Sequence, residues 1–213
     1  MPTEKMPETR YTPASYTPKI EARAKEDHEP AKIVGYGAVY YAADDPGTEY
    51  TIWDDFVERI MPGCFDRAVR EDDPRSFFNH DENIILGRKS AGTLNLAVDD
   101  VGLRYEITPP DTEAGRGVVE AVRRRDVTGS SFMFMPRDVT WREIDGLVIR
   151  ELRDVELWEV GPVVFPAYTS TTSELRSRLV AEARKHGITL DATPRTVNVR
   201  RRLLQLRART MNL

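Results

Sequence analysis

The sequence lacks the residues and segments on which several classes of protein depend. Its 213 residues include one cysteine, Cys64, which excludes a disulfide framework and a cysteine-based zinc cluster. No apolar run approaches the roughly 20 residues that a membrane-spanning helix needs, and the polar N-terminus has no apolar core of the signal-peptide kind. We therefore expect a protein that is made and kept in the cytosol.

An excess of charge of one sign is also absent. The chain has 31 Lys or Arg residues and 35 Asp or Glu residues, a formal net charge of −4, which argues against a nucleic-acid or membrane-surface polycation. The exception lies between Glu174 and Leu213, where ten basic residues stand against three acidic ones. This stretch, with its interleaved leucines, is suited either to docking on an acidic partner or to packing on the chain's own acidic body.

Composition divides the chain into four parts. Residues 1–31 hold five of the 14 prolines and few apolar residues, so we predict a flexible N-terminal tail, with a short helical turn near residues 20–25 as its one candidate element. Residues 32–170 contain most of the strand patterns and are predicted to form the main domain. A helix is expected within 171–190, and 191–213 form the basic C-terminal segment.

Alternating apolar and polar residues predict a mainly β fold, of α+β class, with mostly antiparallel strands. Hairpins are expected around residues 99–102 and across Asp145–Gly146. A turn at Pro62–Gly63 is expected to lead into a short helix, and a longer amphipathic helix is expected over residues 112–126. The architecture is therefore an antiparallel β domain with a few helices.

Three histidines limit the places where acid–base chemistry can occur. His28 lies in a charged part of the predicted tail, and His186 ends a predicted helix, where a cation interacts favourably with the helix dipole. His80 follows a short apolar strand pattern, and a histidine at such a place can serve as a general base near neutral pH. A purely structural histidine explains the same position equally well.

Ser130 and Ser131 stand out among the eight serines because they directly follow Gly129 at the start of a strand pattern. Strand alternation places Ser130 on the face of Phe132 and Phe134 and Ser131 on the opposite face. If the two phenylalanines pack in the core, Ser131 points away from it and is accessible. The alternative is that two small residues simply begin a strand.

A third candidate is a carboxylate in the last strand pattern. Simple alternation places Val155, Leu157 and Glu159 on one face, and an unpaired carboxylate on an apolar face is strongly destabilising. His80 would be a natural partner, since a carboxylate orients an imidazole and stabilises its cation. Glu156, on the polar face, is the alternative acid and is expected to be solvated.

Other kinds of chemistry find little support. Cys64 lies among apolar neighbours and is predicted to be a small buried residue rather than a nucleophile. One cysteine and one credible histidine give no ligand cluster for a metal, and no Gly-rich phosphate loop is found. We therefore predict neither a metal nor a cofactor.

The order of these motifs resembles that of the prohead proteases of HK97-like tailed bacteriophages. The resemblance covers about residues 33–168 and is carried by ERIMPGCFDRAV, FNHDENIILGR, GTLNLAVDDVGLRYEI, DVTGSSFMF and LWEVGPVVFPAY. That family is similar in fold to the herpesvirus assemblins, which implies an antiparallel β-barrel surrounded by helices. One departure is Gly161, since the family commonly has serine at that place.

The resemblance implies a serine endopeptidase in residues 32–170, with His80, Ser131 and Glu159 as its catalytic residues. The implied substrates are a scaffold protein or the scaffolding segment of the major capsid protein, and the protease itself. A second copy of the protease, in a homodimer, is a further implied partner. It would act in the procapsid within the bacterial cytoplasm and be absent from, or degraded in, the mature virion. Both termini are then expected to be dispensable for chemistry and needed for packaging. The competing interpretation is a non-enzymatic capsid-assembly or scaffold module with the same β domain.

Overall fold

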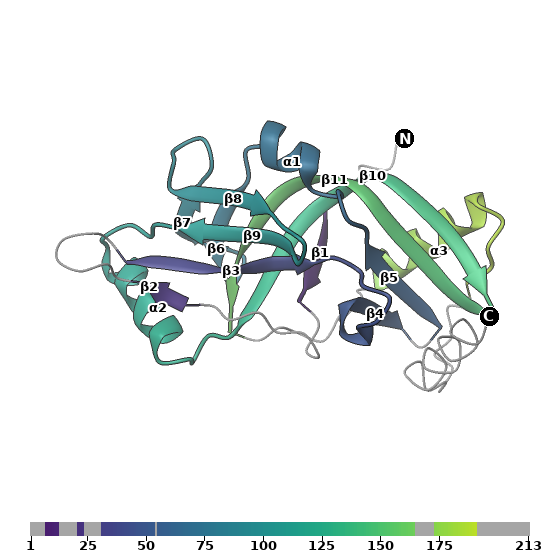
Figure 1. Ribbon diagram of the computed structural model, residues 1–213, viewed down its shortest axis with the longest axis horizontal. Coiled ribbons are helices and arrows are strands. Elements are labelled where there is room, and N and C mark those ends of the chain that lie inside the picture. Colours follow the sequence, from purple (N-terminus) through teal and green to yellow (C-terminus); the bar gives the residue numbers. More distant parts are fainter. Residues whose placement is uncertain (1–6, 13–20, 24–30, 54, 165–172, 191–213) are drawn as a thin grey trace.

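A computed structural model describes residues 7–12, 21–23, 31–53, 55–164 and 173–190 of the chain. These residues form two β-sheets and three α-helices (Figure 1), which confirms the prediction of a mainly β fold of α+β class. The sheets have seven and four strands, and within the described part they do not close on themselves. The closed barrel that the resemblance implies is therefore not what these residues form.

The larger sheet has the strand order β1-β10-β11-β5-β4, with β6 paired to β11 and β7 paired to β6. Its strands are β1 (Glu8–Tyr11), β4 (Glu49–Trp53), β5 (Phe56–Ile60), β6 (Arg75–Phe78), β7 (Asp81–Arg88), β10 (Gly129–Ile144) and β11 (Leu147–Val163). The smaller sheet consists, in spatial order, of β2 (Glu21–Arg23), β3 (Lys32–Val39), β9 (Gly102–Ile107) and β8 (Leu94–Val98). The helices are the 3₁₀ turn η1 (Pro46–Thr48), α1 (Asp66–Glu71), α2 (Glu113–Arg123) and α3 (Ser173–Lys185).

The β10–β11 hairpin is the longest feature of the molecule, and its two strands run side by side through Figure 1. Asp145 and Gly146 form its turn with φ values of 52° and 73°, the left-handed pair that a tight hairpin turn of this kind needs. The predicted turn is thus confirmed. The strand pairs described are mostly antiparallel, as expected, and the exceptions are the parallel pairs of β11 with β5 and with β6. Parallel neighbours come from distant parts of the chain, and local patterns do not reveal them.

The other local predictions largely hold. The hairpin of β8 and β9 and the helices α1 and α2 lie where their patterns place them. Thr112 caps the start of α2, since its hydroxyl accepts a hydrogen bond of 3.1 Å from the Gly115 N–H. The basic segment 191–213 lies outside the described residues.

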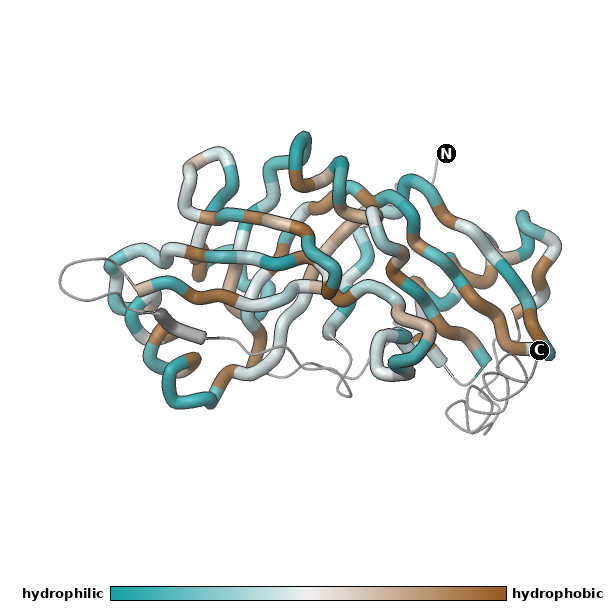
Figure 2. Tube along the Cα trace, viewed as in Figure 1, coloured by the Kyte–Doolittle hydropathy of each residue, from teal (hydrophilic) through white to brown (hydrophobic). Residues whose placement is uncertain are grey.

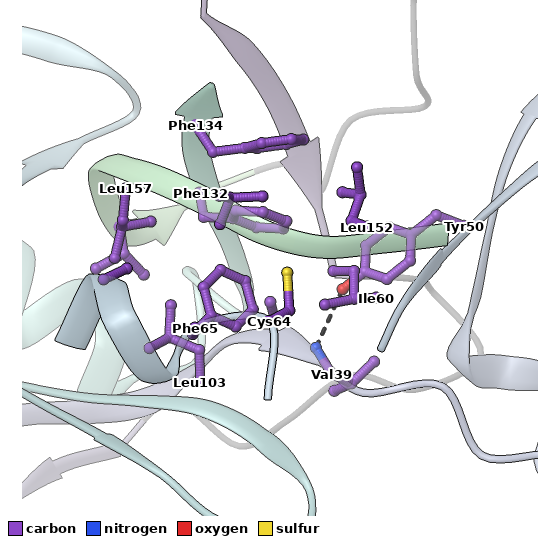
Figure 3. Packing of buried hydrophobic residues seen from close by; sticks show 14 of the residues in the cluster. Val39, Tyr50, Ile60, Cys64, Phe65, Leu103, Phe132, Phe134, Leu152 and Leu157 are labelled. Atoms are coloured by element: carbon purple, nitrogen blue, oxygen red, sulfur yellow. Dashed lines mark hydrogen bonds between the residues drawn. The ribbon is translucent and has the colours of Figure 1, made fainter. Parts of the chain in front are cut away.

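Aromatic residues of β10 form the centre of the core. Phe132 is fully buried, with its ring centroid 5.1 Å from that of Phe134 and 5.6 Å from that of Phe65. Cys64 is buried among them (Figure 3), and burial raises the pKa of its thiol well above the ordinary value. The prediction that Cys64 is buried is confirmed, and a raised thiol pKa leaves little of the reactive thiolate. Figure 2 shows hydrophobic and hydrophilic residues alternating along the strands of the β10–β11 hairpin.

Part of the predicted N-terminal tail is structured. β1 pairs with β10, and β2 pairs with β3, so the prediction of a flexible tail is wrong for residues 8–11 and 21–23, and no helical turn forms at 21–23. The side chains of Glu8 and Arg10 are buried. Charged residues in a proline-rich stretch indicate solvent exposure unless partners elsewhere in the chain are known.

Those partners lie on β5 and β11. Arg10 donates hydrogen bonds of 2.7 and 3.0 Å to the carboxylate of Glu58. Arg150 donates bonds of 2.8 Å to Glu8 and 2.7 Å to Glu58. All four side chains are at most 1% exposed, and their two positive and two negative charges balance. Residues 8–11 of the predicted tail are therefore part of the fold.

Arg150→Met is expected to lower the free energy of unfolding by about 3–5 kcal/mol, because the buried carboxylates of Glu8 and Glu58 are then left to share Arg10, and one buried negative charge is uncompensated. Urea unfolding of the full chain measures the change. Arg142→Met is the matched control, since Arg142 is 55% exposed and lies 3.5 Å from Glu151, so about 1 kcal/mol or less is expected. Equal losses in the two variants would contradict this account of the cluster.

Acid is expected to weaken the fold through Glu8. Burial by itself raises the pKa of Glu8, but the charges of Arg150 and Arg10 outweigh burial and lower it from 4.5 to about 2. A carboxylate with a lowered pKa in the folded state stabilises it above the unfolded value, and this contribution is lost as the pH falls from 4.5 toward 2. Urea unfolding across this interval should show a shallower decline for Glu8→Gln than for the parent chain. A decline of the same steepness in both proteins would speak against Glu8 as the cause.

Candidate active site

The structure brings His80, Ser131 and Glu159 together beside the β10–β11 hairpin. The Oγ atom of Ser131 lies 2.7 Å from Nε2 of His80, and Nδ1 of His80 lies 2.9 Å from Oε2 of Glu159. With Glu159 ionised, the Nδ1–H donates to its carboxylate, so Nε2 is left to accept the hydroxyl proton of Ser131. A hydroxyl, a base and an orienting carboxylate in series can activate a serine as a nucleophile.

The two adjacent serines have different surroundings. Phe132 is buried in the core, and Ser130 shares its face, as strand alternation predicts. The hydroxyl of Ser130 forms a hydrogen bond of 3.1 Å with the hydroxyl of Tyr105. Ser131 points to the other face and toward His80. The geometry therefore associates Ser131, and not Ser130, with the imidazole.

Ser131 is less accessible than its strand position predicts, since only 1% of it is exposed. The reason is β1, which pairs with β10 and places Tyr11 opposite Ser131. The Tyr11 ring meets the His80 ring edge-on, with centroids 5.8 Å apart. Burial raises the pKa of Tyr11, and the nearby charge of Glu159 raises it further. The most accessible of the three grouped side chains is His80, at 20% exposure.

A bulge in β11 turns Glu159 toward Ser131. The register of β11 against β10 shifts by one residue at Trp158. Because of this extra residue, Leu157 and Val160 both point into the core, while Glu159 points to the face that carries Ser131. Simple alternation placed Glu159 on the face of Leu157, and that reasoning is wrong even though the residue it selected does contact His80.

The alternative acid has a different partner. Glu156 accepts a hydrogen bond of 3.0 Å from the indole N–H of Trp158, on the exposed side of the bulge. Glu159 is 4% exposed, and His80 is the partner of its buried carboxylate. A buried carboxylate needs such a partner, whereas one held at the surface does not.

His80 occupies an unusual backbone position. Asn79 and His80 connect β6 to β7 with φ values of 55° and 61°. Two-residue turns with this left-handed pair favour asparagine followed by glycine. A histidine in place of the glycine costs about 1–2 kcal/mol of backbone strain. Strain of this kind is commonly found at functional positions.

Gly161, the cross-strand partner of Ser131, allows β6 to approach β11 closely. A Cβ atom at Gly161 would lie 2.6 Å from the carbonyl oxygen of Phe77 and 2.7 Å from the hydroxyl of Ser76. The serine that the resemblance leads one to expect at this position would therefore collide with the backbone of β6. Glycine is required here by packing.

The site in the described part of the chain includes neither of the other two histidines. His28 lies outside the described residues, and His186 stacks on Trp141 with ring centroids 6.2 Å apart, in a structural role. Sequence reasoning missed Tyr11 and Asn79 as neighbours of the site. Tyr11 carried no signal in the sequence, whereas asparagine before His80 is a typical turn residue and marked a turn there.

No three His, Cys, Asp or Glu side chains in the described part of the chain are grouped to hold a metal ion. Nor is any helix in that part both long and apolar enough to cross a membrane.

Comparison with known proteins gives a match at the level of the family. A family model described as caudovirus prohead serine protease matches residues 18–186. The solved structure of the bacteriophage T4 capsid assembly protease, gp21, is similar with a TM-score of 0.47 and 9% sequence identity, over 76% of this chain and 98% of that chain. No curated protein matches the sequence.

Proposed function

Because the chain belongs to the family of caudovirus prohead serine proteases, we propose that it is a serine endopeptidase with Ser131, His80 and Glu159 as its catalytic residues. Family membership supports the reaction class. The hydrogen-bonded series from Ser131 through His80 to Glu159 supports the choice of residues and is the observation that carries the proposal.

In the first half of the reaction, Nε2 of His80 accepts the hydroxyl proton of Ser131 as Oγ attacks the carbonyl carbon of a peptide bond. The Nδ1 proton stays on the ring, and Glu159 stabilises the imidazolium charge. His80 then gives the proton on Nε2 to the leaving amine, and the C–N bond breaks. The N-terminal part of the substrate remains bound to Ser131 as an ester.

In the second half, water replaces the amine. Nε2 of His80 takes a proton from water as its oxygen attacks the ester carbon, and the same proton returns to Ser131 when the C–O bond breaks. Ser131 and Glu159 are nearly inaccessible to solvent. Exclusion of water strengthens the electrostatic stabilisation of the imidazolium by the carboxylate.

The proposed substrates follow from family membership. They are a scaffold protein or the scaffolding segment of the major capsid protein, together with the protease itself. We place the reaction inside the procapsid in the bacterial cytoplasm, because a protease that cut free capsid subunits would act before the shell had formed. After maturation the protease would be lost from the virion or degraded.

The experiment that tests this proposal combines a covalent probe for reactive serines with co-expression of the phage's capsid protein. We expect the probe to label Ser131 of the parent chain, and the capsid protein to be shortened at a defined site. Ser130→Ala should be labelled as well, and Ser131→Ala should not. A parent chain that supports procapsid assembly, but neither reacts with the probe nor shortens the capsid protein, would favour the non-enzymatic assembly module.

A further inference from the structure

We propose that Asn79 is a positioning residue, which holds the turn carrying His80 against the strand that carries Glu159. The inference rests on the proposed function, because it concerns the geometry of the same site. Ser131 and Glu159 lie within the paired strands β10 and β11. His80 is the one residue of the three that lies in a turn, so its position depends on what holds that turn.

The turn that carries His80 is strained by its own sequence. Its second residue, His80, has a φ of 61°, where glycine would be free of strain. Asparagine at the first position, with a φ of 55°, belongs to the residue types that tolerate this region well. The strained conformation at His80 therefore needs contacts from outside the turn.

Asn79 makes two such contacts, both to the end of β11. Its backbone N–H donates a hydrogen bond of 3.2 Å to the carbonyl of Pro162. Its side-chain Oδ1 accepts a bond of 2.8 Å from the N–H of Val164. At the other end of β6, Arg75 lies opposite Glu159 in the parallel backbone pairing of β6 with β11. The segment leading to His80 is thus tied to β11 on both sides of the His80–Glu159 hydrogen bond.

This tie acts on the reaction through geometry. The imidazole must lie between Glu159 and Ser131, at 2.9 Å from one and 2.7 Å from the other. A displacement of about 1 Å in a group of this kind can lower a rate by about 100-fold. Only a side chain with an acceptor three bonds from Cα and a tolerance for positive φ does what Asn79 does here. Asparagine and aspartate both qualify, glycine supplies only the tolerance, and alanine supplies neither.

The test compares Asn79→Asp, Asn79→Gly and Asn79→Ala in the full chain, with kcat and KM measured on the capsid protein or a peptide derived from its cleavage site. We expect kcat to fall least for Asp, by about tenfold for Gly and by about 100-fold for Ala, with KM nearly constant. The control is Asp145→Ala, since Asp145 also has a positive φ of 52° but lies in the β10–β11 turn. It should lower the thermal midpoint while kcat stays near the parental value.

A second readout does not depend on activity. In the parent chain, the Nδ1 proton held by Glu159 should give a downfield proton resonance in NMR spectra, assigned by its loss in His80→Gln. We expect this resonance to persist in Asn79→Asp and to weaken or vanish in Asn79→Ala. A parent chain that shows the resonance but no proteolysis would contradict the proposed function. The role of Asn79 would then be decided by the resonance of the variants alone. Parental kcat in Asn79→Ala, or an unchanged resonance in that variant, would overturn it.

Discussion

Replacement of Ser131 by alanine is expected to abolish cleavage of the capsid protein while leaving the fold intact. Loss of the nucleophile from a serine–histidine–acid group lowers kcat by about 10⁴- to 10⁶-fold. The substitution removes one hydroxyl, whose partner is Nε2 of the partly exposed His80. His80 keeps its bond to Glu159 in the variant. The thermal midpoint should therefore stay close to that of the parent chain, and cleavage is followed on gels.

Ser130→Ala is the matched control, one residue away on the same strand. It removes the hydrogen bond to Tyr105 in the core, which is expected to lower stability by about 1 kcal/mol. Cleavage should continue at nearly the parental rate, so the two neighbours should show opposite patterns of stability and activity. Normal cleavage by the Ser131→Ala protein would exclude Ser131 as the nucleophile, and Ser130 would be the next residue to test.

The second large effect concerns His80 and Glu159 together. His80→Ala is expected to lower kcat by several orders of magnitude. Among the contacts described for the Ser131 hydroxyl, only Nε2 of His80 lies at a distance where it can accept the proton. Glu159→Gln should be slow but measurable, since an amide no longer stabilises the imidazolium charge. The double variant should lose little beyond His80→Ala, because the carboxylate acts through the imidazole. Single-turnover cleavage of a peptide substrate measures all three.

Glu156→Gln provides the control for the acid. Glu156 lies two residues before Trp158, the extra residue of the bulge, and accepts a hydrogen bond from its indole N–H, so cleavage should remain near normal. Strictly additive losses in the double variant would show that His80 and Glu159 act independently. A large loss at Glu156 with none at Glu159 would reverse the assignment of the acid.

Local features of the sequence were sufficient for much of the framework. Asp145–Gly146 predicts a tight hairpin turn because both residues tolerate positive φ, and the structure has that turn. The length and apolar spacing of residues 112–126 predict a helix, and the structure has α2 there, with the Thr112 hydroxyl capping its first turn. Alternation correctly separates Ser130 from Ser131, because a regular strand reverses its side chains at every residue. Each of these features depends on neighbours within a few residues.

Features that join distant segments were decided by the tertiary structure. Glu8 and Arg10 are part of a buried strand only because Glu58 and Arg150, far along the chain, neutralise them. The sequence by itself determined which residue types were available for catalysis: few histidines, a pair of serines after a glycine, and a carboxylate near the end of a strand. Their meeting required the bulge at Trp158, which turns Glu159 to the face of Ser131, and the turn that holds His80 between them. A one-residue shift in register reverses a strand's faces, and alternation alone cannot reveal it, because the shift depends on packing against the neighbouring strand.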